Sequence, residues 1–440
     1  MSDNLIAPVR TRSGRRPSMS SSVLALFDVF AACGATDHGG VHRPCASAAD
    51  GEARDAFEAA LKTADAETRT DAVGNQFGIF NLTGEASAPL VMMGSHLDSQ
   101  PRGGRFDGAL GVAAAVAVGE ALMRARAEGV IFDANFCAVN WTNEEGARFR
   151  PSLLGSGVFV GRHATEEALA VRDDDGIRLG DALSAIGRRG VDRPPALPAC
   201  YLELHVEQGV TLEQAGASIG VVVRNWGATK FDVTFEGEQA HTGPCPMPLR
   251  RDALLAAAHL IVEARTIAKR WPGRVHSSVG RLLVSPNSAN VVPSETRLSL
   301  EIRCDDDGVL ASASALADEA IERAAHLANA VAASVVRNER TIRMMPEAVC
   351  ALVEAAAETT DRRSLRLDTV AGHDAISLLG HCPTGLVFVP SAGGVAHNEA
   401  EFTSTADVEA GFEVCLEAVS RLCRSAGSPE RALRDMSVTP

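Results

Sequence analysis

The sequence predicts an α/β protein of two domains, with the smaller domain inserted into the larger one. Three observations support this expectation. The chain has 440 residues, which is more than one ordinary hydrophobic core organises. Strand-like and helix-like patterns alternate up to about residue 215 and resume near Pro346, which favours a sheet with helices on both faces. Between these two parts the elements follow a different order.

The first part of the larger domain alternates helices and strands. Its apolar periodicity predicts helices at 22–33, 50–65 and 109–127, and strands at 74–82, 89–95 and 131–140. The helix at 109–127 is rich in alanine and valine, which suits close packing on a sheet. The stretch 161–200 is polar and interrupted by glycine and proline, and we expect a helical excursion over the functional site.

The inserted segment begins near Val222 and has the order of a ferredoxin-like sandwich, βαββαβ. The expected elements are strand 229–237, helix 249–269, strands 275–285 and 294–304, helix 308–328 and strand 331–341. The α/β pattern then resumes with a helix at 347–359, a strand at 385–390 and a closing helix at 406–424. The expected boundaries are a disordered tail at 1–20, the larger domain at 21–222 and 343–425, the inserted domain at 223–342, and a tail at 426–440.

The composition argues against nucleic acid and membrane as partners. The net charge is -14, and no basic stripe offsets it. No apolar run approaches the roughly 20 residues that span a bilayer. The ten cysteines form no CxxC pair, which indicates reduced thiols rather than a disulfide framework. Asp28 interrupts the only stretch that resembles a signal core, so we expect a cytoplasmic protein.

Five separated side chains of the metal-ligating type lie in Gly-rich or acidic turns: His96, Asp107, Glu145, His205 and His397. Three imidazoles and two carboxylates are typical of a hydrolytic zinc-type centre. His96 follows a buried strand, and the carboxylate of Asp107 could bridge two ions because each of its oxygens can take one.

Two acidic positions beside these ligands suggest supporting roles. Asp98, two residues after His96, is placed to accept the other N–H of the imidazole. Glu144 and Glu145 are adjacent, so on an extended backbone they would point in opposite directions, one toward a metal and the other toward a proton of the attacking water. Taken alone, such pairs have little specificity, because surface and capping groups often show the same spacing.

Eight motifs in one order, from about residue 22 to 424, closely resemble the hydantoinase/carbamoylase family of binuclear metal amidohydrolases. This family is related to the co-catalytic zinc aminopeptidases and includes N-carbamoyl-L-amino-acid hydrolase, allantoate amidohydrolase and β-ureidopropionase. The motifs are GSHLDS, GGRFDGALG, WTNEEGARF, ELHVEQG, GEQAHTGPCPMPLRRDA, NSANVVP…EIR, AGHDA and PSAGGVAHNEAEFT.

The resemblance implies two divalent metal ions in each subunit. The implied ligands are His96, Asp107 and His205 for one ion, and Asp107, Glu145 and His397 for the other. Glu144 would be the general base and later the acid that protonates the leaving nitrogen. Mixed histidine and carboxylate ligation suits zinc first, and manganese, cobalt and nickel are also compatible.

The resemblance also implies that the inserted domain is a lid that forms a homodimer. His241 would polarise the scissile carbonyl, and Asn290 and Arg303 would hold the substrate carboxylate, a group that a guanidinium binds in bidentate fashion. Gln208, Gly393 and Gly394 would line the pocket. Pro244-Cys245, Ala396 and Glu399 depart from the usual family pattern without removing a ligand or the base, so they bear on substrate preference.

These features together predict a hydrolase that cleaves the ureido C–N bond of N-carbamoyl-L-amino acids, releasing amino acid, ammonia and carbon dioxide. Allantoate amidohydrolase and β-ureidopropionase are the alternatives, and a dipeptidase follows them. A non-catalytic relative that uses the site only to bind ligands would normally have lost a metal ligand or the base, and this chain has lost neither.

Overall fold

The computed structural model describes residues 19–424 and residue 433, and these form two compact units. The larger unit contains the chain up to Val222, then Met345–Leu367, and the chain from His373 onward. The smaller unit contains Val223–Met344 and Asp368–Gly372. The tails expected at 1–20 and 426–440 lie outside the described residues, except that residues 19 and 20 already belong to helix α1 (Met19–Ala32) and that residue 433 is described.

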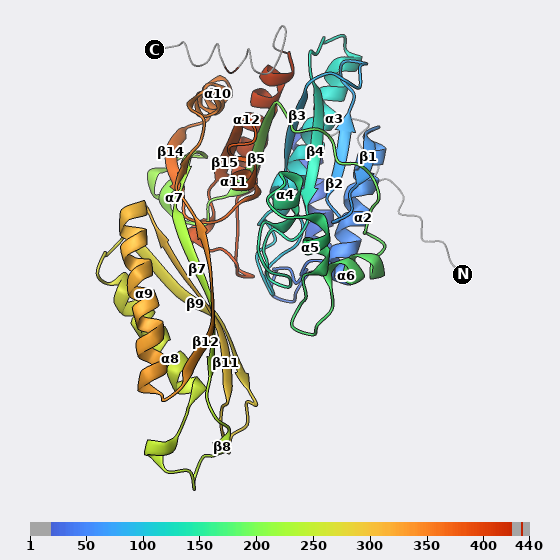
Figure 1. Ribbon diagram of the computed structural model, residues 1–440. Coiled ribbons are helices and arrows are strands. Elements are labelled where there is room, and N and C mark those ends of the chain that lie inside the picture. Colours follow the sequence, from blue (N-terminus) through green and yellow to red (C-terminus); the bar gives the residue numbers. More distant parts are fainter. Residues whose placement is uncertain (1–18, 425–432, 434–440) are drawn as a thin grey trace. The chain divides into compact units, whose positions relative to one another are not determined.

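A mixed nine-stranded sheet forms the framework of the larger unit (Figure 1). The strand order is β1-β2-β4-β3-β5-β15-β6-β13, and β14 pairs with β6. The central strands β4, β3, β5 and β15 are parallel to one another, whereas β2 beside β4 and β6 beside β15 are antiparallel. The nine strands are β1 (Glu67–Thr70), β2 (Gln76–Phe80), β3 (Leu90–His96), β4 (Asn135–Trp141), β5 (Cys200–Val206), β6 (Ile219–Asn225), β13 (Arg343–Met344), β14 (Ser364–Thr369) and β15 (Thr384–Val389).

Helices cover both faces of this sheet, as the alternating pattern predicts. Strand β5 shows the arrangement, because alternate residues of a strand point to opposite faces. Leu204 packs beside Gly411 of α12 (Thr405–Arg424), while Glu203 accepts a hydrogen bond from the backbone N–H of Ala375 in α11 (Asp374–Leu378). The other helices of the larger unit are α2 (Ala48–Thr63), α3 (Ala109–Ala127), α4 (Leu154–Phe159), α5 (Thr165–Ala170), α6 (Leu179–Ala185), α7 (Thr211–Ala215) and α10 (Glu347–Thr359).

The smaller unit is a four-stranded antiparallel sheet with two helices, and its element order βαββαβ confirms the predicted ferredoxin-like sandwich. The order across the sheet is β12-β7-β11-β9, and the register runs without interruption along β7 and β11. One face packs on the two helices, with Phe231, Leu300 and Leu260 fully buried in the shared core. The elements are β7 (Gly227–Glu236), α8 (Ala253–Ala268), β9 (Val275–Ser285), β11 (Glu295–Cys304), α9 (Asp307–Leu327) and β12 (Val331–Arg340), with the short pair β8 (Ala240–His241) and β10 (Val291–Val292).

Aspartate caps fix the starts of both helices of the smaller unit. The carboxylate of Asp252 accepts the backbone N–H of Leu255 at the start of α8, and Asp306 accepts that of Val309 at the start of α9. Such caps satisfy backbone donors that the first helical turn leaves without partners.

Two features of the architecture differ from the expectation. The excursion at 161–200 contains only the short helices α5 and α6, because glycine and proline interrupt any longer run. The segment Asp368–Gly372 belongs to the smaller unit, although it comes after the chain has returned to the larger one. Backbone contacts hold it there: Trp226 N–H donates to the carbonyl of Thr369, and Arg303 donates to that of Val370.

Among the described residues, no helix is long and apolar enough to cross a membrane.

Candidate metal centre

The predicted ligands of the larger unit lie at one edge of its sheet, where parallel strands end. His96 is the last residue of β3, Glu145 follows β4, His205 is near the end of β5, and His397 lies in the loop after β15. These four strands are neighbours in the order β4-β3-β5-β15. Since the carboxyl ends of parallel strands meet at the same edge, residues far apart in the sequence are brought together there.

Asp107 connects two groups of potential ligands. Its Oδ1 lies 3.4 Å from His96 Nε2 and 3.0 Å from His205 Nε2. Its Oδ2 lies 3.3 Å from His397 Nε2, which is also 3.5 Å from Glu145 Oε2. Within each group the ligand atoms are less than 4.8 Å apart. Two imidazoles with a carboxylate, and one imidazole with two carboxylates, are donor sets that fit divalent metal ions.

Backbone carbonyls orient the two buried imidazoles. His96 Nδ1 lies 2.8 Å from the carbonyl of Asp98, and His205 Nδ1 lies 3.0 Å from that of Val206. An Nδ1–H that donates to these carbonyls leaves Nε2 as the ligand atom.

The carboxylate of Asp98 does not take the predicted role of accepting the second N–H of His96. It lies 3.9 Å from His96 Nδ1, and the carbonyl of the same residue accepts instead. The carboxylate accepts the backbone N–H groups of Glu144 at 3.1 Å and Glu145 at 3.3 Å. Asp98 therefore fixes the turn that presents the two adjacent glutamates.

The side chains of Glu144 and Glu145 contact different partners, as predicted, but the backbone between them is not extended as that prediction assumed. They lie in a bend after β4, where Asn143 has a φ of 57°, rather than on extended backbone. Glu144 Oε2 lies 3.6 Å from His96 Nε2, whereas Glu145 accepts hydrogen bonds from the backbone and side chain of Gln100. Burial raises the pKa of Glu144 well above its ordinary value, which is common for carboxyl groups that exchange protons during catalysis.

Glycines make the approach of Asp107 possible. Gly108 has a φ of 67°, and a Cβ there would lie 2.5 Å from the His96 ring. A Cβ on Gly104 would lie 2.1 Å from the carboxyl carbon of Glu401, a buried residue that the sequence reasoning missed. Glu401 accepts the backbone N–H groups of Phe106 and Asp107. The only sequence signal for it is an acid four residues after His397.

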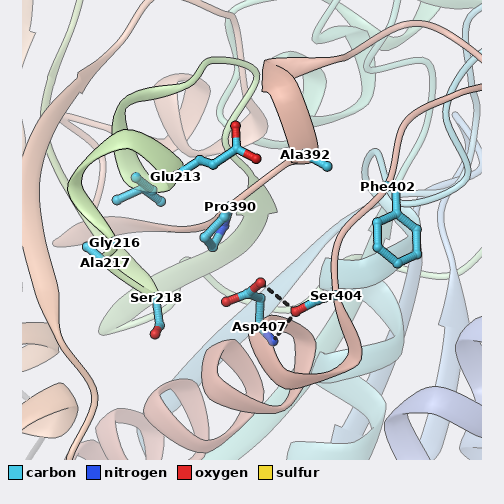
Figure 2. Close-up of a pocket in the computed structure, with 10 residues that line it drawn as sticks. Glu213, Gly216, Ala217, Ser218, Pro390, Ala392, Phe402, Ser404 and Asp407 are labelled. Atoms are coloured by element: carbon cyan, nitrogen blue, oxygen red, sulfur yellow. Dashed lines mark hydrogen bonds between the residues drawn. The ribbon is translucent and has the colours of Figure 1, made fainter.

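Gln208 and the Gly393-Gly394 turn have partners near the centre. Gln208 Nε2 donates to Asp107 Oδ2 at 2.9 Å, and the backbone N–H of Gly393 donates to Glu213 Oε2 at 3.0 Å. An open cavity of about 330 Å³ lies beside this turn and is lined in part by Glu213, Pro390 and Phe402, which Figure 2 labels. None of the predicted ligands lines it.

A third group of buried ligand-type side chains shares His205 with the first group: Glu203, His205 and His373. Hydrogen bonds already occupy its carboxylate, because Glu203 accepts from Ser95 Oγ at 2.7 Å and from the backbone N–H of Ala375 at 2.7 Å. The ring of His373 packs edge-on against His205, with centroids 4.4 Å apart. His373 thus supports the imidazole of His205, one of the predicted ligands, from the side.

The smaller unit brings His241 and Asn290 together but places Arg303 elsewhere. His241 is exposed on β8, which pairs with β10, and the carbonyl of Asn290 accepts the N–H of Thr242. Both lie beyond the end of the β7–β11 ladder where Glu295 pairs with Glu236, since β8 follows β7 and β10 precedes β11. Arg303 is eight residues further along β11, which corresponds to roughly 25 Å of strand. There its guanidinium donates to Glu301 and to the carbonyl of Val370.

Comparison with known proteins identifies the family. The model of peptidase family M20/M25/M40 matches residues 92–421. N-carbamoyl-L-amino-acid amidohydrolase of Rhizobium meliloti is 37% identical, over 87% of this chain and 91% of the relative. The solved structure of an amidase of the hydantoinase/carbamoylase family from Burkholderia vietnamiensis has a TM-score of 0.87 at 36% identity, covering 92% of this chain and 97% of that one. This chain belongs to the hydantoinase/carbamoylase family.

The carbamoylase-family protein is also similar to a relative with a different substrate in its name. Allantoate amidohydrolase of Bacillus subtilis (strain 168) is 31% identical, over 92% of this chain and 98% of the relative. The named relatives are amidohydrolases, and the family is metal-dependent. The predicted fold and family are thereby confirmed, and the chain is assigned to the hydrolases.

Proposed function

We propose that this protein hydrolyses the ureido C–N bond of N-carbamoyl-L-amino acids at a centre of two divalent metal ions. The observation that carries the proposal is the position of Asp107, whose two oxygens face separate groups of ligands. When bound, the ions supply Lewis acidity and lower the pKa of water at the site. Zinc is the first choice, and manganese, cobalt and nickel suit the same ligands.

Glu144 moves the proton in this proposal. Its Oε2 lies beside the ligand atom of His96, yet Glu144 belongs to neither group of ligands. It takes a proton from the attacking water and gives it to the nitrogen that leaves. The products are the amino acid, ammonia and carbon dioxide.

The separation of Arg303 from His241 and Asn290 supports a homodimer that shares its substrate sites. A small ureide cannot span roughly 25 Å, so one substrate cannot touch all three side chains of a single smaller unit. In the proposed dimer, Arg303 and the pair His241 and Asn290 of one subunit serve different sites, and Arg303 binds the substrate carboxylate. Gln208, Gly393 and Gly394 line the substrate pocket. His241 and Asn290 complete the site of the other subunit, where His241 polarises the carbonyl.

The smaller unit also offers a surface for this dimer. Strand β9 is an edge strand of its sheet, and Leu282 and Leu283 on it are 37% and 41% exposed. On helix α8, Leu255 and Val262 are 41% and 65% exposed. Exposed apolar side chains beside an unpaired strand edge are typical of a surface that another copy covers.

Subunit complementation tests the shared site. His241→Ala and Glu144→Gln should each be nearly inactive alone, whereas co-expressed mixtures should recover about one quarter of wild-type activity, since half of random dimers carry one intact site. Ammonia release by purified mixtures measures the recovery. Mixtures as inactive as the separate variants would show that each subunit uses its own His241.

The substrate class needs a direct screen. Ammonia release should be measured for N-carbamoyl-L-amino acids, allantoate and 3-ureidopropionate, with protein loaded in turn with zinc, manganese, cobalt and nickel. Turnover of carbamoyl amino acids supports the proposal, and faster turnover of allantoate would favour the activity named for the Bacillus relative. Bound metal without turnover of any ureide would support a protein that only binds ligands.

We place the enzyme in the cytoplasm, where its ten thiols stay reduced.

A further inference from the structure

We propose that Glu401 is a positioning residue that ties the Asp107 segment to the His397 loop and thereby sets the affinity for the second metal ion, held by Asp107, Glu145 and His397. The inference rests on the two-metal centre of the proposed function. It does not depend on which ureide is the substrate.

Glu401 holds the backbone beside the shared ligand. The residue is 3% exposed, and its Oε1 accepts the N–H of Phe106 at 2.9 Å and the N–H of Asp107 at 3.0 Å. Removal of this side chain would leave two buried backbone N–H groups without their acceptor. The position of the Asp107 backbone therefore depends on a side chain that lies almost 300 residues later in the sequence.

The same residue closes the loop that carries His397. The N–H of Glu401 donates to the carbonyl of Asn398 at 3.0 Å, and the carbonyl of Phe402 accepts the N–H of Ala392 at 2.8 Å. His397 has a φ of 52°, a conformation that persists only where its surroundings hold it. Glu401 thus connects both ends of the second ligand group, Asp107 and His397.

Phe106 also packs edge-on against Phe402, with ring centroids 6.1 Å apart, whereas the ion pair between the two segments is weak. Arg102 and Glu399 form an ion pair at 3.0 Å, but the side chain of Arg102 is 62% exposed. Exposed ion pairs contribute about 0–1 kcal/mol or less to stability. Glu399 is therefore a matched control, since it is a glutamate of the same loop whose carboxylate pairs with an exposed arginine of the same segment.

The first ligand group has separate support. The imidazoles of His96 and His205 sit at the ends of β3 and β5, and each is oriented by a backbone carbonyl. Asp107 belongs to both groups, but only the second group also takes its histidine from the loop of Glu401, so loss of Glu401 should weaken the second ion more than the first. The expected loss of affinity is about 10- to 100-fold, which is usual when a group that orients metal ligands is removed.

Metal binding by Glu401→Ala, Glu401→Gln and Glu399→Ala tests the inference. We would measure bound zinc per subunit at limiting zinc, and the absorption of the cobalt-loaded proteins. Glu401→Ala should retain one ion and lose the second. Glu401→Gln should bind both within about 3-fold of wild type, because its amide oxygen can still accept both N–H groups. Glu399→Ala should match wild type.

Several outcomes would overturn the inference. These are two tightly bound ions in Glu401→Ala, loss of both ions from a folded Glu401→Ala, or equal losses in the alanine and glutamine variants. If Glu401→Ala does not fold, Gly104→Ala replaces it, because the added Cβ would displace the carboxylate while the glutamate remains. The readout of this experiment is metal content, so its result does not depend on whether the enzyme hydrolyses any ureide in the substrate screen.

Discussion

Glu144 is the residue on which the proposed chemistry depends most directly. We expect Glu144→Gln to lower kcat at least about 100-fold, the usual contribution of a positioned general base. The same variant should bind two metal ions, because Glu144 belongs to neither ligand group. Ammonia release and bound zinc per subunit measure the two effects. Glu166→Gln on the exposed face of α5 is the control, and a Glu144→Gln enzyme with normal turnover would disprove the assignment.

The sequence predicts residues of this centre well where a motif follows a buried strand. Such positions place His96 and Glu145 at the ends of adjacent parallel strands, and the structure brings their side chains to one edge. The sequence did not predict which side chains form hydrogen bonds with the backbone. The carboxylate of Asp98 accepts from the backbone of Glu144, and Glu401 binds that of residues almost 300 positions away. No periodicity or spacing encodes such contacts.

At the scale of elements, helix α3 depends on a glycine for its distance from the sheet. A Cβ on Gly111 would lie 2.3 Å from the carbonyl oxygen of Leu204 in β5. Gly111→Ala should therefore lower the free energy of unfolding of the larger unit by about 1–3 kcal/mol, the usual cost of overpacking. Thermal unfolding measures the change. Gly280→Ala, with nothing within 4 Å of its Cβ, should be neutral or slightly stabilising, and equal effects of the two variants would contradict the packing argument.

Long periodic elements could be predicted closely, and short buried ones could not. The helices at 109–127 and 347–359 have the predicted bounds, because many turns of apolar periodicity define them. Strands β5 and β14 and helix α11 were not predicted as elements. Strand β5 alternates apolar with polar residues, but it is buried along its whole length, so its polar residues Glu203 and His205 do not mark a solvent-facing side. In the sequence, its acidic and histidine residues therefore indicate part of a motif rather than part of a strand.

At the scale of the whole molecule, buried carboxyl groups gather around the candidate metal centre of the larger unit. Burial raises the pKa of Asp98, Glu144, Glu203 and Asp374 above their ordinary values. Two divalent cations would offset this concentration of carboxyl groups and so stabilise the folded unit. The stability of the folded larger unit should therefore depend on metal binding at the site.

Metal removal should therefore destabilise the larger unit. At a metal concentration 100 times the Kd, one bound ion stabilises the folded state by about 2.7 kcal/mol, and chelation removes this contribution. Calorimetry before and after treatment with EDTA should show a lower Tm, which added zinc restores. The smaller unit contains none of the predicted metal ligands, so any separate transition of that unit should not shift. A Tm that is insensitive to EDTA would argue against tight metal binding.

The ligands of the two groups differ in their exposure to solvent, and this difference bears on how the centre exchanges its ions. The side chains of His96 and His205 are each 1% exposed, whereas that of His397 is 49% exposed. In the proposed two-metal centre, an ion beside His397 would have a short route to solvent, and an ion between the two buried imidazoles would not. We therefore expect the outer position to equilibrate with whichever divalent metal the medium supplies, and the inner position to keep the metal acquired during folding. Enzyme prepared in one metal and transferred to another should become a mixed-metal form with a defined order of replacement.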